Sequence, residues 1–227
     1  MNQPAFTHRT DAATPAYTAR TIHVFGLLAA CSMLLVWMNH EFVFTKEVFR
    51  ELAGGSVNPY QSDLQYEALR RTSIWGYAFA PFQTAIRISL VALVMQMTCL
   101  LGGAEISFGK LFRIAAVAFF AILFGSFLQV VWIALQPTAA IDQAALGIVP
   151  DSVAAWFSTA KDAPLLLYLA LSRVSLSSLL WVLLLYWGLR DTGLLGLRGA
   201  AAAVGVAWCI SSALQVGTTM LLRSIVS

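Results

Sequence analysis

The chain has 227 residues, of which 59% are hydrophobic and only 11% are charged. Soluble globular domains carry roughly 25% charged residues, so this composition excludes a soluble enzyme as well as a disordered chain. The formal net charge of +3 comes without a clustered basic face, which excludes a nucleic-acid-binding protein. Each of the three cysteines, Cys31, Cys99 and Cys209, lies within an apolar block, and their spacing fits no disulfide scaffold or metal site. We interpret them as small hydrophobic residues of a core.

The apolar residues are gathered into blocks of about 20 residues, the length that crosses a bilayer. A polar N-terminal tail, residues 1–21, precedes the first block at 22–38. No small-residue cleavage pattern follows this block, so we predict an uncleaved first span rather than a signal peptide. His23 and Trp37 stand at its two ends, where amphipathic rings favour the level of the lipid headgroups.

A hydrophilic stretch, residues 39–73, follows the first span. Its segment 42–52 alternates apolar and charged residues at helical spacing. Ser62 and Gln65 form a possible capping box that would open a second helix. We expect short helices on the membrane surface here rather than a folded domain.

The second apolar block, residues 74–101, is longer than one crossing requires. Pro81 is expected to kink the helix or to open its first turn, so we place the second span at 81–101. The third span, 114–135, is free of charged residues. The short connection between these two spans is basic and carries Lys110 and Arg113.

The fourth predicted span, 165–189, is interrupted by a polar cluster at 172–178. Either one long tilted helix passes through this cluster, or a break near Ser172 separates a dipping segment from a shorter crossing. A short interfacial helix is expected before it, at 152–160, and the fifth span, 200–222, carries no charge. The chain is therefore predicted to be an all-α integral membrane helical bundle. It would have about five transmembrane helices in one domain, residues 22–227, plus short interfacial helices.

The orientation of the bundle is predicted from the Lys and Arg residues of its loops. Six of these residues fall on each side of the membrane. In the two short loops on the side of the N-terminus, however, four of the six charged residues are Lys or Arg. This density predicts an N-terminus in the cytoplasm and a C-terminus outside.

Two charged residues, Arg87 and Arg173, lie inside the predicted spans, and neither has an acidic residue within its own span. A charge in hydrocarbon is expensive and usually has a reason. One hypothesis is that both side chains extend toward the membrane surface and act as anchors. The other is that the two arginines form one cationic site for a lipid phosphate or another anion.

No pattern for catalysis or for cofactor binding stands out. His23 and His40 lie at opposite ends of the first span, and His8 lies in the tail, so the histidines predict no metal or haem site. No buried base accompanies a serine, and the serines of 172–178 are expected to bond helix carbonyls or to line a helix break. We therefore expect no catalytic residue, no metal and no cofactor, and a protein that is not an enzyme.

A stripe of small residues recurs every four positions along the fifth span: Ala201, Gly205, Cys209, Ala213 and Gly217. Residues at this spacing share one helix face, and small side chains let another backbone approach closely. The third span repeats the pattern more briefly with Ala121 and Gly125, and the first span with Gly26 and Ala30. We predict close helix contacts at these faces, with or without a second protein in the groove.

From residue 78 onward the layout of the chain resembles the Ypt/Rab-interacting-protein (YIP) membrane family, including its bacterial members. The features are a span ending in LLGG, the basic connection SFGKLFR, an uncharged span, then SSLLWVLLLYWGLRDTGL and GAAAAVGVAW. The resemblance implies a five-helix membrane domain with a cytoplasmic N-terminus, no catalytic residue, and a bacterial inner membrane as the location. The tyrosine-glycine-proline element of eukaryotic members is absent, so binding of a small GTPase is not implied.

The leading hypothesis is a non-enzymatic multi-pass membrane protein that organises membrane or partner proteins. Its expected partners are the lipid bilayer, including anionic lipid, and a membrane protein or a second copy of the chain. The alternative is a small transporter or an accessory subunit of a transport complex. Such proteins use broken helices near the middle of the membrane, as Pro81 and the serine cluster could provide.

Overall fold

The computed structural model describes residues 15–52, 58–136, 150–156 and 165–226. These residues form helices and their connections. The one strand-like contact among them is an isolated antiparallel bridge between Ser152 and Ser175. The predicted all-α class is confirmed.

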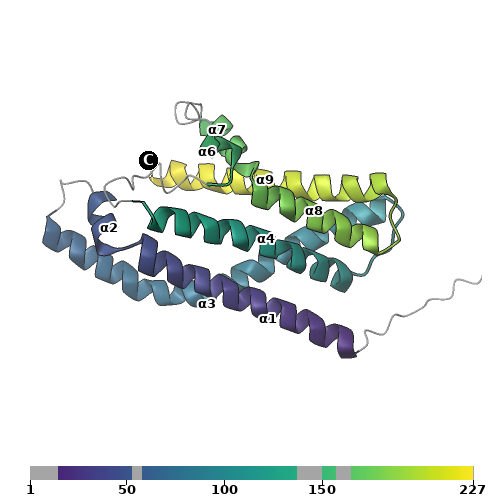
Figure 1. Ribbon diagram of the computed structural model, residues 1–227, viewed down its shortest axis with the longest axis horizontal. Coiled ribbons are helices and arrows are strands. Elements are labelled where there is room, and N and C mark those ends of the chain that lie inside the picture. Colours follow the sequence, from purple (N-terminus) through teal and green to yellow (C-terminus); the bar gives the residue numbers. More distant parts are fainter. Residues whose placement is uncertain (1–14, 53–57, 137–149, 157–164, 227) are drawn as a thin grey trace, which may run out of the picture.

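The longer helices run along the bundle in alternating directions (Figure 1). In chain order the described helices are α1 (Pro15–Met38), the π-helical turn η1 (Asn39–Val43), α2 (Lys46–Leu52), α3 (Pro59–Leu101), α4 (Phe108–Ala134), α6 (Val153–Trp156), α7 (Leu165–Arg173), α8 (Leu176–Asp191) and α9 (Leu197–Val226). One end of the bundle, the α2 end, holds the end of α1, α2, the start of α3 and the end of α4. The opposite end, the short-loop end, holds the start of α1 and the α3–α4 and α8–α9 connections.

Within the part of the chain that the structure describes, four helical segments are long and apolar enough to cross a membrane: Thr21–Val43, Tyr60–Leu101, Phe108–Ala134 and Leu197–Thr218. The outer surface of the bundle exposes many large hydrophobic side chains, as lipid-facing helices do. The chain is therefore an integral membrane protein. The predicted first, second, third and fifth spans lie in these four segments, whereas the predicted fourth span is divided between α7 and α8.

The first span is longer than predicted. Helical structure does not end at residue 38 but continues through η1, where the Phe44 N–H donates to the carbonyl oxygen of Asn39 at 2.8 Å. Val43 at the end of this turn is buried with Val130 and Ile133 of α4. Burial of Val43 explains why the polar residues Asn39 to Glu41 do not terminate the helix.

The predicted second surface helix is the first part of α3, which runs unbroken for 43 residues through Pro81. Asn58 caps α3, because its side chain accepts from the Tyr60 N–H at 3.1 Å, and Pro59 takes the first helical position. The capping box predicted at Ser62 was wrong, since Ser62 lies within the helix and is buried. At 1.5 Å per residue α3 is about 64 Å long, more than twice the thickness of a hydrocarbon core.

The core is built around α4, which contacts α1, α3 and α8. Buried residues recur on the inner face of each helix at spacings of three and four residues. They are Ile88, Ala92, Met95 and Cys99 of α3; Ala115, Ala118 and Ala121 of α4; Trp181, Leu185 and Leu189 of α8; and Ala200, Ala203, Val204 and Ala207 of α9. Of the three cysteines predicted as core residues, Cys99 is buried, Cys31 is half-buried and Cys209 is exposed.

The polar cluster of the predicted fourth span breaks the helix at Val174 and Ser175, the second of the two alternatives. The helix that follows, α8, has 16 residues and is about 24 Å long, shorter than a hydrocarbon core of about 30 Å. The interfacial helix predicted at 152–160 is described from Val153 to Trp156, and its remainder lies outside the described residues.

Candidate functional site

The break between α7 and α8 is closed by hydrogen bonds of its own serines. Ser175 caps α8: its Oγ accepts from the Ser178 N–H at 3.1 Å, while the Ser175 N–H donates to the Ser178 Oγ at 3.0 Å. This reciprocal capping box gives hydrogen-bond partners to two backbone N–H groups, those of Ser175 and Ser178, which would otherwise lack them at the start of a helix. The expectation that the serines line a helix break is confirmed.

Residues 151–153 supply the remaining backbone partners at the break. The Val153 N–H donates to the Val174 carbonyl at 2.8 Å, and the Leu176 N–H donates to the Asp151 carbonyl at 3.0 Å. Irregular backbone at membrane depth is tolerated only where its polar groups are satisfied by protein or line a cavity. The short segment 151–153 therefore makes the break compatible with the membrane interior.

The side chain of Asp151 lies at the first turn of α8, where its Oδ2 accepts from the Ser177 N–H at 2.9 Å. A carboxylate is favoured there because the helix dipole is positive at its N-terminus. The other oxygen, Oδ1, is buried without a hydrogen-bond partner. Sequence reasoning missed Asp151, because no local spacing relates it to a serine 26 residues away.

The start of α8 lies deep in the bundle. Gly125 of α4 packs directly against it: a Cβ at position 125 would be 2.6 Å from the Ser177 Cβ. Gly125 is at the centre of the uncharged run 114–135 of α4. The break, its serines and Asp151 are therefore near the midplane of the membrane-spanning region.

Arg173, the last residue of α7, points into the bundle on its other side. Its Nη1 donates to the Oε1 of Gln215 in α9, and its Nε is buried without a hydrogen-bond partner. The side chain as a whole is half-buried. Gln215 therefore holds the guanidinium group of Arg173, and its role as an anchor at the membrane surface stays a prediction.

The two predicted arginines lie on different helices, Arg87 on α3 and Arg173 at the end of α7. The helix that carries Arg87 packs against α9. Arg87 is exposed on the outside of the bundle. Glu41, just beyond the predicted end of the first span, pairs with Arg70 at 4.0 Å. That Arg87 and Arg173 bind an anion stays a prediction.

The stripe of small residues on α9 does not form a contact within the chain. All five of its residues, from Ala201 to Gly217, are exposed, and a Cβ at Gly205 would meet no atom within 4 Å. The core of the bundle uses the adjacent face of α9 instead. That the stripe contacts a second protein stays a prediction. The corresponding prediction for α4 holds, because Ala121 and Gly125 are buried, whereas Gly26 and Ala30 of α1 are exposed.

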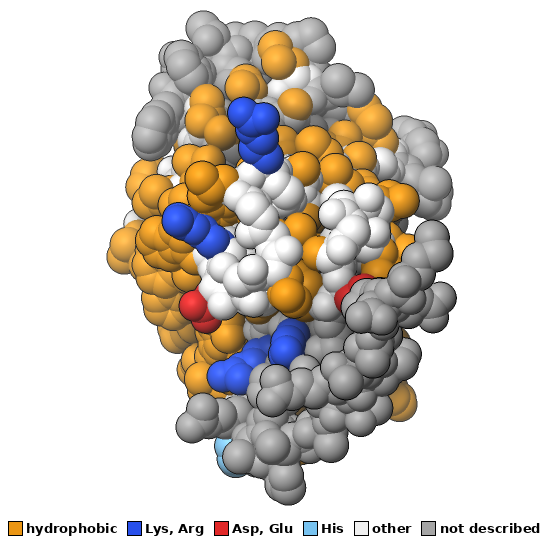
Figure 2. Space-filling view, turned by 90° about the vertical axis from the view of Figure 1, so that its right-hand side faces the viewer, with side chains coloured by type: hydrophobic (Ala, Val, Ile, Leu, Met, Phe, Trp, Pro, Cys, Tyr) orange, Lys and Arg blue, Asp and Glu red, His pale blue; other side chains and the backbone are white. Residues whose placement is uncertain are grey.

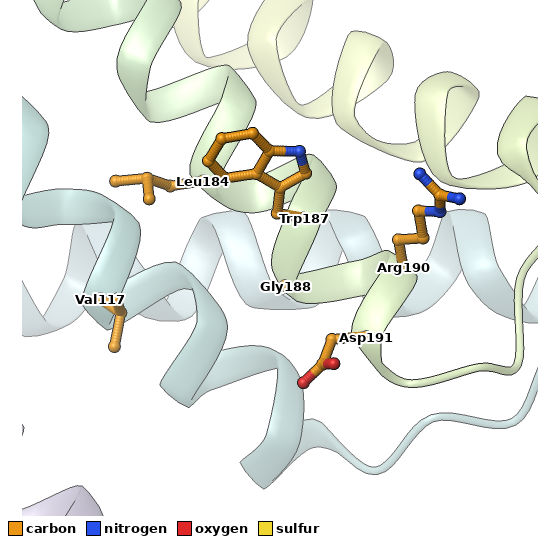
Figure 3. Close-up of a pocket in the computed structure, with 6 residues that line it drawn as sticks. All are labelled: Val117, Leu184, Trp187, Gly188, Arg190 and Asp191. Atoms are coloured by element: carbon orange, nitrogen blue, oxygen red, sulfur yellow. The ribbon is translucent and has the colours of Figure 1, made fainter.

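The short-loop end carries basic side chains among hydrophobic ones, as Figure 2 shows. An open groove of about 590 Å³ lies near this end between α4 and α8. Its lining residues are Val117, Leu184, Trp187, Gly188, Arg190 and Asp191 (Figure 3). In the close-up the side chains of Arg190 and Asp191 point in different directions, so the groove presents no single charged centre.

Among the described residues, no three His, Cys, Asp or Glu side chains are gathered as they would be around a metal ion. His40 instead packs its ring against Tyr77, with ring centroids 6.1 Å apart. Comparison of the chain with protein-family models, with curated proteins and with solved structures finds no match.

Proposed function

We propose that this integral membrane protein is non-enzymatic and organises partners in the bilayer through the exposed face of α9, a role in keeping with its resemblance to the YIP family. One observation carries the proposal: α9 completes the core with Ala203 and Ala207, yet turns its stripe of small residues outward. Small side chains on an outer face let the backbone of a partner helix approach closely. The basic short loops support an N-terminus in the cytoplasm, and the family resemblance supports a bacterial inner membrane as the location.

The test uses the native Cys209, which lies exposed in the middle of the stripe. In membranes, a short bismaleimide should join two copies of the chain through Cys209 and give a species of twice 24.6 kDa. Gly205→Leu should reduce this product strongly, because the large side chain separates the two backbones. Val206→Leu, on a neighbouring exposed position of the same helix, is the matched control and should leave the product unchanged.

Cys99 provides a second control, because it is buried in the core and should form no product. Equal cross-linking in wild type and Gly205→Leu would contradict the proposal. The proposal would also be contradicted if Cys209 in membranes were joined neither to a second copy of the chain nor to another membrane protein.

A small transporter is the second candidate, and the break before α8 favours it. Transporters build their sites from interrupted helices near the midplane, with ionisable groups close by. Ser177→Cys tests this candidate, since a membrane-impermeant thiol reagent can reach mid-depth only through a water-filled path. Labelling at position 177, with native Cys99 as the unreactive control, would favour transport; complete protection would count against it.

A further inference from the structure

The groove between α4 and α8 lies where two close contacts hold these helices in register. A Cβ at Gly125 would be 2.6 Å from the Ser177 Cβ, and a Cβ at Gly188 would be 2.5 Å from the Cγ2 of Ile114. The spacing from 114 to 125 along α4 equals the spacing from 177 to 188 along α8. The depth of each groove residue on one helix can therefore be related to the depth of those on the other.

The level of Gly188 marks the edge of the hydrocarbon region at the short-loop end. Ile114, which faces Gly188, begins the charge-free run 114–135, and this run is about as long as a hydrocarbon core is thick. Val117 and Leu184 line the groove about one helical turn nearer the midplane. This part of the groove is therefore apolar and lies at the depth of the lipid tails.

The mouth of the groove lies at the level of the lipid headgroups. Trp187 is exposed beside Gly188, at the boundary that indole rings favour. Arg190 and Asp191 follow on the last turn of α8, about 3–5 Å further out. The groove is thus apolar at the depth of acyl chains and charged at the depth of headgroups, as a phospholipid is.

Arg190 and Asp191 offer two separate charges of opposite sign. Both side chains are exposed, and neither takes part in the ion pairs formed among the described residues. Consecutive residues of a helix do not face each other, and Figure 3 shows these two side chains pointing in different directions. Each can therefore contact a different group of the same ligand, one anionic and one cationic.

We propose that this groove binds a phospholipid whose headgroup carries a primary ammonium group, of the phosphatidylethanolamine class. The guanidinium group of Arg190 presents a planar fork of N–H donors that matches phosphate oxygens. The carboxylate of Asp191 accepts hydrogen bonds from the ammonium N–H groups. An acyl chain lies along Val117 and Leu184. The groove, at about 590 Å³, has a volume typical of sites for small ligands.

Other headgroups complement only one of the two charges. The phosphate of phosphatidylcholine can bind Arg190, but its quaternary ammonium group has no N–H to donate to Asp191. Phosphatidylglycerol carries a net negative charge and brings no cation to the Asp191 carboxylate. The lipid site goes beyond the proposed partner surface on α9 and does not depend on it. Cross-linking at Cys209 should therefore be the same in the Arg190 and Asp191 variants as in wild type, and either idea can fail alone.

The test measures which lipid the full-length protein retains. Protein in mild detergent is mixed with equal amounts of phosphatidylethanolamine, phosphatidylcholine and phosphatidylglycerol that share the same acyl chains, and bound lipid is counted by native mass spectrometry. The site variants are Asp191→Asn and Arg190→Gln. Their matched controls are Glu105→Gln and Arg198→Gln, since both residues are exposed at the short-loop end and neither lines the groove.

Wild type and both controls should retain phosphatidylethanolamine in preference to the other two lipids. Asp191→Asn should bind it about tenfold more weakly, as expected for the loss of a charge-assisted hydrogen bond, and should no longer prefer it to phosphatidylcholine. Arg190→Gln should weaken the binding of both of these lipids, because both lose their phosphate contact.

Val117→Trp provides an independent variant, because it fills the groove without changing either charge. It should weaken the retention of phosphatidylethanolamine while keeping the wild-type melting temperature, since Val117 is exposed. The proposal is overturned if wild type retains phosphatidylethanolamine no better than phosphatidylcholine, or if phosphatidylglycerol is retained best. Asp191→Asn with the wild-type preference would overturn it as well.

Discussion

Gly125 of α4 and Ser177 of α8 lie so close together that a single methyl group at position 125 would be 2.6 Å from the Ser177 Cβ. Gly188 of α8 stands in the same relation to Ile114, whose Cγ2 would be 2.5 Å from a new Cβ. These two glycines let α4 and α8 form the most extensive contact between helices in the bundle. The close approach of Gly125 to Ser177 also sets the depth in the bundle at which α8 begins.

The first prediction follows from this contact. Gly125→Ala should destabilise the bundle by about 1–3 kcal/mol, because the added methyl group overpacks the interface. The measurement is thermal unfolding in detergent. Gly109→Ala is the control, since Gly109 is exposed on the same helix and a Cβ there meets nothing within 4 Å, so the melting temperature of this variant should not fall.

A second change tests whether the loss comes from Ser177 itself. In the Gly125→Ala background, Ser177→Gly removes both atoms that the new methyl group would strike, and it should restore part of the lost stability. A Gly125→Ala protein as stable as wild type would show that α4 and α8 are not in contact at this point.

The second prediction concerns the cap of α8. Ser175→Ala removes the acceptor of the Ser178 N–H, and the loss of an N-cap costs about 0.5–2 kcal/mol. Amide hydrogens of the first turn of α8 should exchange faster with solvent deuterium, while those of α4 should not change. Ser211→Ala on α9 provides the control, and faster exchange in both variants would argue against a specific role of the cap.

The third prediction concerns the attachment of α2 to α3. The carboxylate of Asp63 forms ion pairs with Lys46 at 3.0 Å and with Arg50 at 2.8 Å. Exposed ion pairs stabilise by at most about 1 kcal/mol, so Asp63→Asn should barely alter the melting temperature. It should nevertheless speed tryptic cleavage at Lys46 and Arg50, because α2 is then free to leave α3. Glu67→Gln, an exposed acid one turn further along α3, should leave cleavage unchanged.

The fourth prediction is the sidedness of the two ends. Single cysteines replacing Lys110 and Arg198, in a protein lacking its native cysteines, should react with an impermeant reagent from one side of the membrane. A cysteine replacing Arg70 should react from the other side. If the cysteines at positions 110 and 70 reacted from the same side, this result would contradict the alternation of the long helices seen in Figure 1.

The positions of the long helices could be predicted from the chain alone, within limits that particular residues explain. The uncharged run 114–135 and the run 200–222 coincide closely with α4 and α9. The first span, predicted at 22–38, was too short. Helical structure continues through the polar residues that follow, because Val43 is buried at the end of η1. Pro81 was expected to mark a boundary, yet it lies within one continuous helix.

The candidate site was only half predictable. Arg87 and Arg173 stood out because charges within apolar blocks are rare. Gln215 and Asp151 did not stand out, since an amide in a helix and an acid in a mixed segment are ordinary in sequence. Their importance comes from contacts across 42 and 26 residues of chain, which no local pattern encodes.

The sequence by itself determined that this is an integral membrane bundle, because blocks of about 20 apolar residues with so few charges are stable only where hydrocarbon surrounds them. It left open whether one long helix passes through the serine cluster or breaks there, since serine side chains can bond the carbonyls of a continuous helix or cap a new one. The tertiary structure decided for the break, because residues 151–153 supply hydrogen-bond partners to its backbone. Only the tertiary structure decided which face of α9 is buried. A helix that is apolar all round can turn about its axis at little cost, so the packing of Ala203 and Ala207 against neighbouring helices sets its rotation and leaves Gly205 facing outward.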